Sequence, residues 1–93
     1  MAALFTSTSS QHGGIETTAL TFLTQLVHLG IIFVPLGYSH PAINDVSEIN
    51  GSSPYGSGTI TGADGKRFPS KTELAIAEHQ GEHFATVVHK FIN

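Results

Sequence analysis

The stretch of sequence that decides the fold covers residues 5–38 and reads FTSTSSQHGGIETTALTFLTQLVHLGIIFVPLGY. It holds, in order, an apolar run, a loop of small and hydroxyl-bearing residues, an amphipathic segment and a second apolar run. A short apolar run bounded by turn residues is typical of a parallel strand that is covered on both faces. The order strand, helix, strand predicts a right-handed βαβ unit and therefore an α/β fold.

The residue types set the boundaries of this unit. The first strand is predicted at residues 2–6, and the helix begins at Glu16, whose charge complements the positive end of the helix dipole. Gly30 ends the helix, residues 31–34 form the second strand, and Pro35 prevents its extension. Apolar side chains at helical spacing predict the buried stripe of the helix, which consists of Ala19, Phe22, Leu23, Leu26 and Val27.

Residues 38–68 are rich in glycine and also contain proline. We predict a long excursion without regular structure, in which only residues 59–61 form a short extended piece. Long irregular loops are uncommon in compact domains unless they are functional. This segment is therefore interpreted as a binding or oligomer-contacting surface.

The last helix has a clear start signal at Pro69-Ser70-x-x-Glu73, a capping box with Ser70 as the N-cap. Gly81 in mid-helix costs about 1 kcal/mol relative to alanine, so we expect another element to pack closely there. Positions at spacings of three and four predict one buried stripe, which consists of Leu74, Ala77, Gly81, Phe84, Val88 and Phe91.

The composition is that of a globular domain, since 40% of the residues are hydrophobic and 12% are charged. A net charge of −3, with only four Lys and Arg residues, leaves no basic patch and argues against nucleic-acid binding. The absence of cysteine excludes disulfides, thiolate metal sites and a cysteine nucleophile, and it fits a cytoplasmic location. No apolar run approaches the roughly 20 residues that cross a membrane, so any membrane contact is expected to be peripheral.

The loop after the first strand is the first candidate site, and it consists of Ser7, Thr8, Ser9, Ser10, Gln11, His12, Gly13 and Gly14. Its composition alone fits an ordinary surface connection. Its position is that of a ligand site, because open α/β sheets bind ligands beyond the carboxyl ends of their strands. Neutral hydroxyls and backbone amides suit the pyrimidine edge of a flavin, whereas the glycine patterns that cradle phosphates are missing.

Six histidines offer further chemistry. His79 and His83 stand four residues apart on a helix, a spacing that can hold a metal, but no third ligand is indicated and a solvated polar face is the preferred interpretation. His28 lies in the last turn of the first helix, where it is interpreted as a C-terminal cap. No arrangement of Ser, His and Asp indicates nucleophilic catalysis, so neither a catalytic side chain nor a metal ligand is predicted.

Several blocks of the sequence carry a family resemblance. They are Ser7-Thr8, Glu16-Thr17-Thr18-Ala19-Leu20-Thr21, Thr24-Gln25-Leu26-Val27-His28, residues 30–38, Ser53-Pro54-Tyr55-Gly56, Gly62-Ala63-Asp64-Gly65, Pro69-Ser70, Glu73-Leu74 and Gln80-Gly81. In this order, they resemble the WrbA-type NAD(P)H:quinone oxidoreductases, and the plant-type members look most similar.

The resemblance implies the carboxyl-terminal half of a flavodoxin-like, doubly wound parallel sheet, so that residues 1–93 form one incomplete domain without its amino-terminal half. It implies FMN as cofactor and NAD(P)H as co-substrate, because in this family the flavin accepts a hydride and passes two electrons to a quinone. Residues 7–14 are then expected to wrap the flavin ring, and His28 to contact it. Members of the family also tend to form homo-oligomers.

The chain departs from the family pattern at four positions. Ser9 and His12 stand where the family has glycine, Ile15 replaces a glutamine, and Leu29 replaces the second histidine of a pair. Side chains at former glycine positions are expected to crowd the ring.

The family's phosphate-binding loop has no counterpart in this sequence. We therefore expect the chain alone to bind FMN no more tightly than millimolar. The alternative function is that of a non-catalytic remnant that interacts with full-length relatives through residues 38–68 and an exposed sheet edge.

Overall fold

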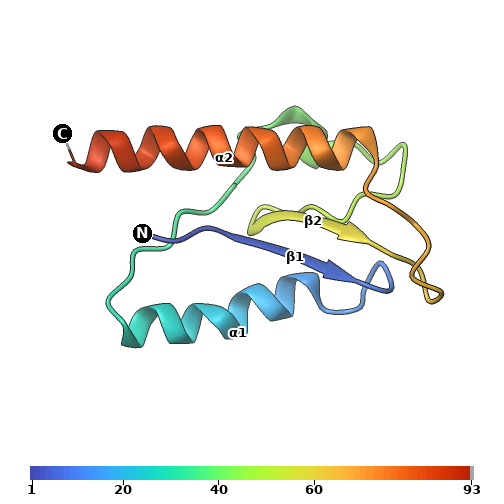
Figure 1. Ribbon diagram of the computed structural model, residues 1–93, viewed down its shortest axis with the longest axis horizontal. Helices are drawn as coiled ribbons and strands as arrows, with labels where there is room; N and C mark the ends of the chain where they lie inside the picture. Colours follow the sequence, from blue (N-terminus) through green and yellow to red (C-terminus); the bar gives the residue numbers. More distant parts are fainter. Residues whose placement is uncertain (93) are drawn as a thin grey trace.

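The computed structural model describes residues 1–92 and contains two strands, two α-helices and one 3-10 helix. In chain order these are β1 (Leu4–Thr8), α1 (Ile15–His28), η1 (Pro41–Asn44), β2 (Gly56–Ile60) and α2 (Lys71–Ile92). The strands lie between the two helices, with α1 on one side and α2 on the other (Figure 1). Parallel strands with a helix on each face confirm the predicted α/β fold class.

The partner strand of β1 is interrupted. β1 and β2 pair in parallel along their full lengths, and ahead of them Ala2 forms a parallel bridge with Phe33. The Ala2 backbone bonds to residues 32 and 34, and the Thr8 carbonyl accepts from the Thr61 N–H. Because alternate residues of a strand direct their hydrogen bonds to the same side, Phe33 and β2 lie end to end along one edge of β1.

Residues 31–34 therefore do not form the second strand that the sequence predicts. Only Phe33 makes a bridge, and Pro35 has no N–H with which to continue the ladder. The paired strand resumes at Gly56, after the chain has made a long excursion. The predicted parallel direction of the two strands is thus confirmed, but the second strand is formed mainly by a distant segment, β2.

Residues 38–68 contain regular structure, so the prediction that this segment is irregular is wrong. The segment includes η1 and all of β2, and the expected extended piece at residues 59–61 overlaps the end of β2. The Gly37 N–H donates to the Pro54 carbonyl at 2.7 Å, which closes the base of the excursion. Gly37 has a φ of 61°, a conformation that favours glycine at this turn.

α1 forms where the sequence predicts it, and it contacts the sheet through a narrow stripe. Ala19 and Leu26 are buried, and Leu23 is half-buried. Phe22 and Val27, which belong to the predicted stripe, are 49% and 73% exposed. The sheet is narrow, so it covers only the centre of the apolar face of α1. Within residues 1–92, nothing covers the flanks of that face.

α2 also starts as predicted, because the capping box is present. The Ser70 hydroxyl accepts from the Glu73 N–H at 3.1 Å, and the Glu73 carboxylate accepts from the Ser70 N–H at 2.8 Å. These reciprocal bonds satisfy two backbone donors at the start of the helix.

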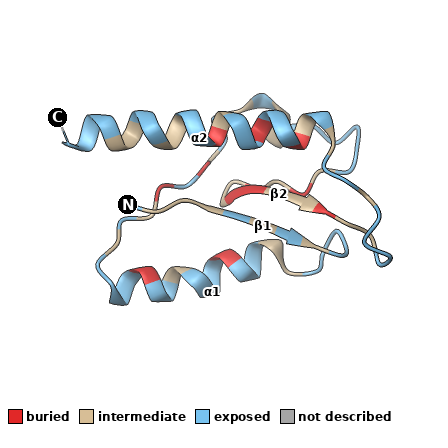
Figure 2. Ribbon diagram, viewed as in Figure 1, coloured by how far each residue is buried: buried red, intermediate tan, exposed pale blue. Residues whose placement is uncertain are grey.

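The buried face of α2 differs from the predicted stripe. The buried residues are Glu73, Ile76 and Gln80, which lie in the half of the helix that covers the strands (Figure 2). Leu74 of the predicted stripe is 57% exposed, and nothing lies within 4 Å of a Cβ built on Gly81. The face of α2 that lies on the strands is therefore not the predicted apolar face, because Glu73 and Gln80 make hydrogen bonds to the strands.

Gln80 shows why a polar side chain faces the sheet. Its Oε1 accepts from the Ser57 N–H at 2.8 Å, and its Nε2 donates to the Leu4 carbonyl at 2.8 Å. Since Leu4 and Ser57 lie at the beginnings of β1 and β2, the buried amide links α2 to both strands at once. A buried amide with both groups paired stabilises a specific packing more than it stabilises the fold in general.

Gln80→Ala is expected to lower the free energy of unfolding by about 2 kcal/mol, because two buried hydrogen bonds of about 1 kcal/mol each are lost. Chemical denaturation followed by circular dichroism measures this difference. Gln25→Ala, an exposed position on α1, is the control and should change stability by less than about 0.5 kcal/mol. Equal effects of the two substitutions would contradict the bridging role of Gln80.

Candidate functional site

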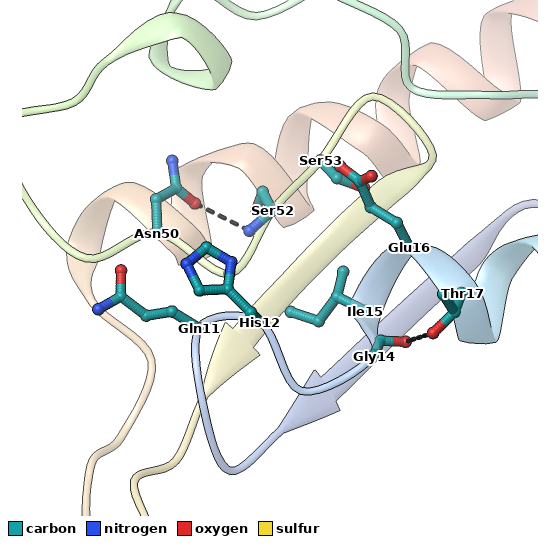
Figure 3. A pocket seen from close by; sticks show the side chains of 10 residues that line it. Gln11, His12, Gly14, Ile15, Glu16, Thr17, Asn50, Ser52 and Ser53 are labelled. Atoms are coloured by element: carbon teal, nitrogen blue, oxygen red, sulfur yellow. Dashed lines mark hydrogen bonds between the residues drawn. The ribbon is translucent and has the colours of Figure 1, made fainter.

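A polar pocket of about 440 Å³ lies next to the loop that follows β1. One wall is the loop and the first turn of α1, and the opposite wall is the end of the excursion before β2 (Figure 3). The lining residues are Gln11, His12, Gly14, Ile15, Glu16, Thr17, Asn50, Gly51, Ser52 and Ser53. This is the end of the sheet at which open α/β proteins bind their ligands.

The structure brings only part of the predicted loop to this pocket. Gln11, His12 and Gly14 line it, and the His12 imidazole points towards Asn50 and Ser52 on the opposite wall (Figure 3). The remaining loop residues named from the sequence do not line the pocket; they are Ser7, Thr8, Ser9, Ser10 and Gly13. Ser9 and His12 are the two residues that stand where the family pattern has glycine. Of these two, only His12 lines the pocket.

The first turn of α1 supplies hydrogen-bond donors. Its N-cap is Gly14, which has a φ of 118° and offers no side chain to cap the helix. The first N–H groups of a helix have no partner within the helix, so those of residues 15–17 remain for a ligand. The Thr17 hydroxyl is engaged differently, since it donates to the Gly14 carbonyl at 3.2 Å.

The opposite wall is held rigidly by side-chain hydrogen bonds. Asn50 donates to the Ala42 carbonyl at 3.1 Å and accepts from the Ser52 N–H at 2.9 Å. The Gly51 N–H donates to the Glu73 carboxylate at 2.8 Å. Gly51 has backbone atoms of Thr59 at 2.6 Å from a Cβ built on it, so only glycine fits there.

Sequence reasoning missed this second wall. Residues 50–53 lie about 40 positions after the loop, and the pairing of β2 with β1 is what brings them to the pocket. The one local signal was the Asn-Gly-Ser-Ser composition, which is also typical of ordinary turns.

The charges at the pocket limit what it can bind. Among residues 1–92, Glu16 is the only lining residue with a formal charge, and no lysine or arginine lines the pocket. The site therefore offers neutral donors and acceptors, which fit the polar edge of a heteroaromatic ring. It offers no cation for a phosphate, and the Glu16 carboxylate repels one.

Glu73 joins the site to the rest of the fold. Its carboxylate is 1% exposed, and it accepts hydrogen bonds from Gly51, Thr59 and Ser70. The Arg67 guanidinium lies 3.1 Å from it and also donates to the Ile60 carbonyl at 2.7 Å. One ion pair, between a buried carboxylate and a half-buried guanidinium, thus connects the pocket wall, the end of β2 and the start of α2.

These partners determine the ionisation of Glu73. Burial by itself raises the pKa of the Glu73 carboxyl. The hydrogen bonds from the Ser70 and Gly51 backbone, from Arg67 and from Thr59 outweigh burial, so the net pKa is lowered. A lowered pKa in the folded state stabilises the fold above the pKa of the unfolded chain, and this stabilisation is lost as the pH falls.

Glu73→Gln is expected to lower the free energy of unfolding by about 2–3 kcal/mol at neutral pH, because charge-assisted hydrogen bonds are lost. The difference between wild type and variant should shrink as the pH falls below about 4.3, the usual glutamate pKa. Denaturant titrations at several pH values measure it. Glu78→Gln, exposed on the same helix, is the control; a difference for Glu73→Gln that does not change with pH would contradict this role.

His28 does not lie at the pocket. It is exposed in the last turn of α1, whereas the pocket contains the first turn, and 14 residues of helix rise about 20 Å. A ring held by residues 11–17 therefore does not reach His28 of the same chain. Contact between His28 and a flavin stays a prediction.

His40, His79 and His83 are half-buried rather than fully solvated. The His79 Nε2 lies 2.9 Å from the Ser39 hydroxyl, and its ring is stacked with that of His83 at 6.1 Å between centroids. The His40 ring lies edge-on to His79 at 5.3 Å. Within residues 1–92, no group of three His, Cys, Asp or Glu side chains is placed to hold a metal ion.

Parallel strands between two helices, with a neutral polar pocket beside the loop after the first strand, define the class of this chain as an open-sheet α/β protein. None of the helices formed by residues 1–92 is long and apolar enough to cross a membrane. No family model matches the chain.

Comparison with known proteins identifies relatives. The chain is 52% identical over 90 residues to quinone-oxidoreductase QR2 of Triphysaria versicolor. It is 54% identical over 91 residues to NAD(P)H quinone oxidoreductase PST3 of Candida albicans, and 48% identical over 90 residues to an NAD(P)H dehydrogenase (quinone) of Chromohalobacter salexigens. These alignments cover 96–97% of this chain but only 44–46% of each relative. The chain thus spans less than half the length of its relatives, and the resemblance to NAD(P)H:quinone oxidoreductases predicted from the sequence is confirmed.

Proposed function

We propose that this chain forms the carboxyl-terminal, ring-binding half of a flavodoxin-like FMN enzyme that transfers electrons from NAD(P)H to a quinone. The observation that carries the proposal is identity of about half of all residues to quinone oxidoreductases over nearly the whole chain. The neutral pocket beside the loop after β1 supports it, because its donors and acceptors suit the polar edge of a flavin ring.

The residues of the pocket have distinct roles in this proposal. The free N–H groups at the start of α1 would donate to the carbonyl and nitrogen acceptors of the ring, and Gly14 allows the backbone to turn close to it. When bound, FMN supplies the hydride-accepting chemistry, while the protein binds and orients it. His12 narrows the pocket from the loop side.

The phosphate of FMN does not fit this pocket, because no cation lines it and Glu16 carries a negative charge. Phosphate anchoring has to come from residues outside the chain described above. Catalysis by residues 1–93 alone is therefore not expected. The alternative, a non-catalytic remnant that associates with full-length relatives, is favoured by one observation, the unpaired outer edge of β1.

The isolated chain is expected to bind FMN and riboflavin with the same weak affinity, a Kd of about 1 mM or weaker. The reason is that the pocket recognises the ring and not the phosphate. Quenching of flavin fluorescence by added chain measures both affinities. Binding of FMN at least tenfold tighter than riboflavin would contradict this assignment of the pocket.

A chimera tests the function itself. Replacing the matched region of the Triphysaria relative by residues 1–93 should yield a protein that retains flavin and reduces a quinone with NAD(P)H. His12→Gly should increase flavin retention severalfold, because it removes a side chain from the pocket. Ser9→Gly, in the same loop but outside the pocket, is the matched control and should change little.

The proposed function would be excluded if the chimera and its His12→Gly variant both fold but neither contains flavin. Circular dichroism shows whether the chimera is folded, and flavin absorbance gives its occupancy. Equal gains from His12→Gly and Ser9→Gly would show that the loop matters only through its flexibility.

A further inference from the structure

The pocket wall opposite the loop after β1 contains a pair of residues with a chemical reactivity of its own. Asn50-Gly51 is the one Asn-Gly pair in the sequence. In such a pair the backbone nitrogen of the glycine can attack the side-chain amide carbon of the asparagine, because glycine has no Cβ to hinder the approach. The product is a five-membered succinimide ring, which water then opens. An Asn-Gly pair in an unrestrained segment is therefore a site of spontaneous deamidation.

The reaction requires only the two residues and water. A bond forms between the Gly51 nitrogen and the side-chain amide carbon of Asn50. The bond from that carbon to Nδ2 breaks, and Nδ2 leaves as ammonia with the proton of the Gly51 N–H. Water then adds to one of the two ring carbonyls and opens the ring, which leaves aspartate or isoaspartate at position 50.

The fold opposes this reaction at the glycine. The Gly51 N–H donates to the Glu73 carboxylate at 2.8 Å, and that carboxylate is 1% exposed. The nitrogen attacks only after it loses its proton. A hydrogen bond to a buried negative charge holds the proton and disfavours the anion that its loss would leave. Gly51 is itself buried, with backbone atoms of Thr59 at 2.6 Å from a Cβ built on it, so it has little room to move away from Glu73.

The fold also restrains the asparagine amide. Its Oδ1 accepts from the Ser52 N–H at 2.9 Å, as Figure 3 shows, and its Nδ2 donates to the Ala42 carbonyl at 3.1 Å. Because Nδ2 is the leaving group, the bond to Ala42 has to be lost during the reaction. Asn50 is nevertheless only half-buried and lines the pocket, so water reaches it from the pocket side.

We propose that Asn50-Gly51 is a site of spontaneous modification in the pocket wall, and that the hydrogen bond from Gly51 to Glu73 sets the rate of the modification. While this bond is intact, the pair is unreactive. Local opening that moves Gly51 away from Glu73 makes the pair reactive. The inference goes beyond the proposed function and does not rest on it, because every contact that it uses lies in residues 42–73.

The modification changes the pocket irreversibly. Loss of Nδ2 removes the donor to the Ala42 carbonyl and leaves two acceptor oxygens facing each other. The new carboxylate adds a negative charge to a pocket in which, among residues 1–92, Glu16 is the one lining residue with a formal charge. Isoaspartate also lengthens the backbone by one carbon, which displaces Gly51 from its close packing against Thr59. Deamidation therefore loosens the wall in which it occurs.

The rate of conversion at position 50 tests the proposal in the full chain. The chain is incubated near neutral pH, and peptide mapping by mass spectrometry gives the amounts of aspartate and isoaspartate at this position over time. Glu73→Met removes the acceptor and should accelerate the conversion about tenfold or more, because a hydrogen bond to a charged group is lost. Glu73→Gln keeps an oxygen that can accept from Gly51, so it should give an intermediate rate.

Two controls separate local release of the glycine from general unfolding. Gln80→Ala removes two other buried hydrogen bonds of α2 and leaves the bond between Gly51 and Glu73 in place, so its rate should stay within about twofold of the wild-type rate. Asp64-Gly65 forms the same ring in an exposed loop and should convert equally in all variants.

Two further measurements complete the design. The wild-type chain in guanidinium chloride gives the unrestrained rate, which should exceed the folded rate by at least as much as the Glu73→Met rate does. Circular dichroism shows whether each variant is folded. The chimera with the Triphysaria relative contains the same residues, and the comparison is made there for any variant that is unfolded in the chain.

Three results would overturn the proposal. Equal rates at position 50 in the wild type and in Glu73→Met would show that Glu73 does not restrain the pair. Equal acceleration by Gln80→Ala and Glu73→Met would assign the rate to general unfolding. A folded wild type that converts as fast as the chain in guanidinium chloride would show that the fold gives no protection.

Discussion

The pairing of β2 with β1 is the constraint on which the rest of this structure depends. Two buried side chains of α2 hold the resumed strand in place. Gln80 links the beginnings of both strands, and Glu73 binds the hydroxyl of Thr59 in β2 and the N–H of Gly51. Because the strand is interrupted between Phe33 and β2, hydrophobic burial alone does not specify where it resumes. Directed hydrogen bonds do.

The same constraint creates the candidate site. The loop after β1 would be an ordinary surface connection without a second wall, and residues 50–53 become that wall only because β2 pairs beside β1. The Glu73 carboxylate fixes the wall through Gly51, while the hydrogen bonds from the Ser70 and Gly51 backbone, with those from Arg67 and Thr59, lower its pKa. A buried charge that makes several hydrogen bonds has a lowered pKa, so the order of the pocket is coupled to pH through one residue.

The pocket and the sheet are both incomplete in this chain. Within residues 1–92, the pocket offers neutral groups for a ring and no cation, and no strand pairs with the outer edge of β1. The relatives contain more than twice the aligned length, so they have further chain with which to complete both features. In a chain of this size, the area left uncovered is large relative to the core, which consists of few buried side chains such as Leu36 and Ile76.

The sequence by itself determined what depends on neighbours along the chain. The capping box at Ser70, the extent of both helices, the apolar start of β1 and the loop after it all follow from local hydrogen bonding and periodicity. The family resemblance also came from the sequence alone, because it depends on the order of short sequence blocks along the chain. Tertiary structure decided what depends on distant partners: that Gly56 resumes the strand, that Asn50 faces His12, and that α2 turns Glu73 and Gln80 inward instead of its apolar stripe. The physical reason is that unpaired backbone groups in the sheet need donors and acceptors, and no local pattern reveals which polar side chain will supply them.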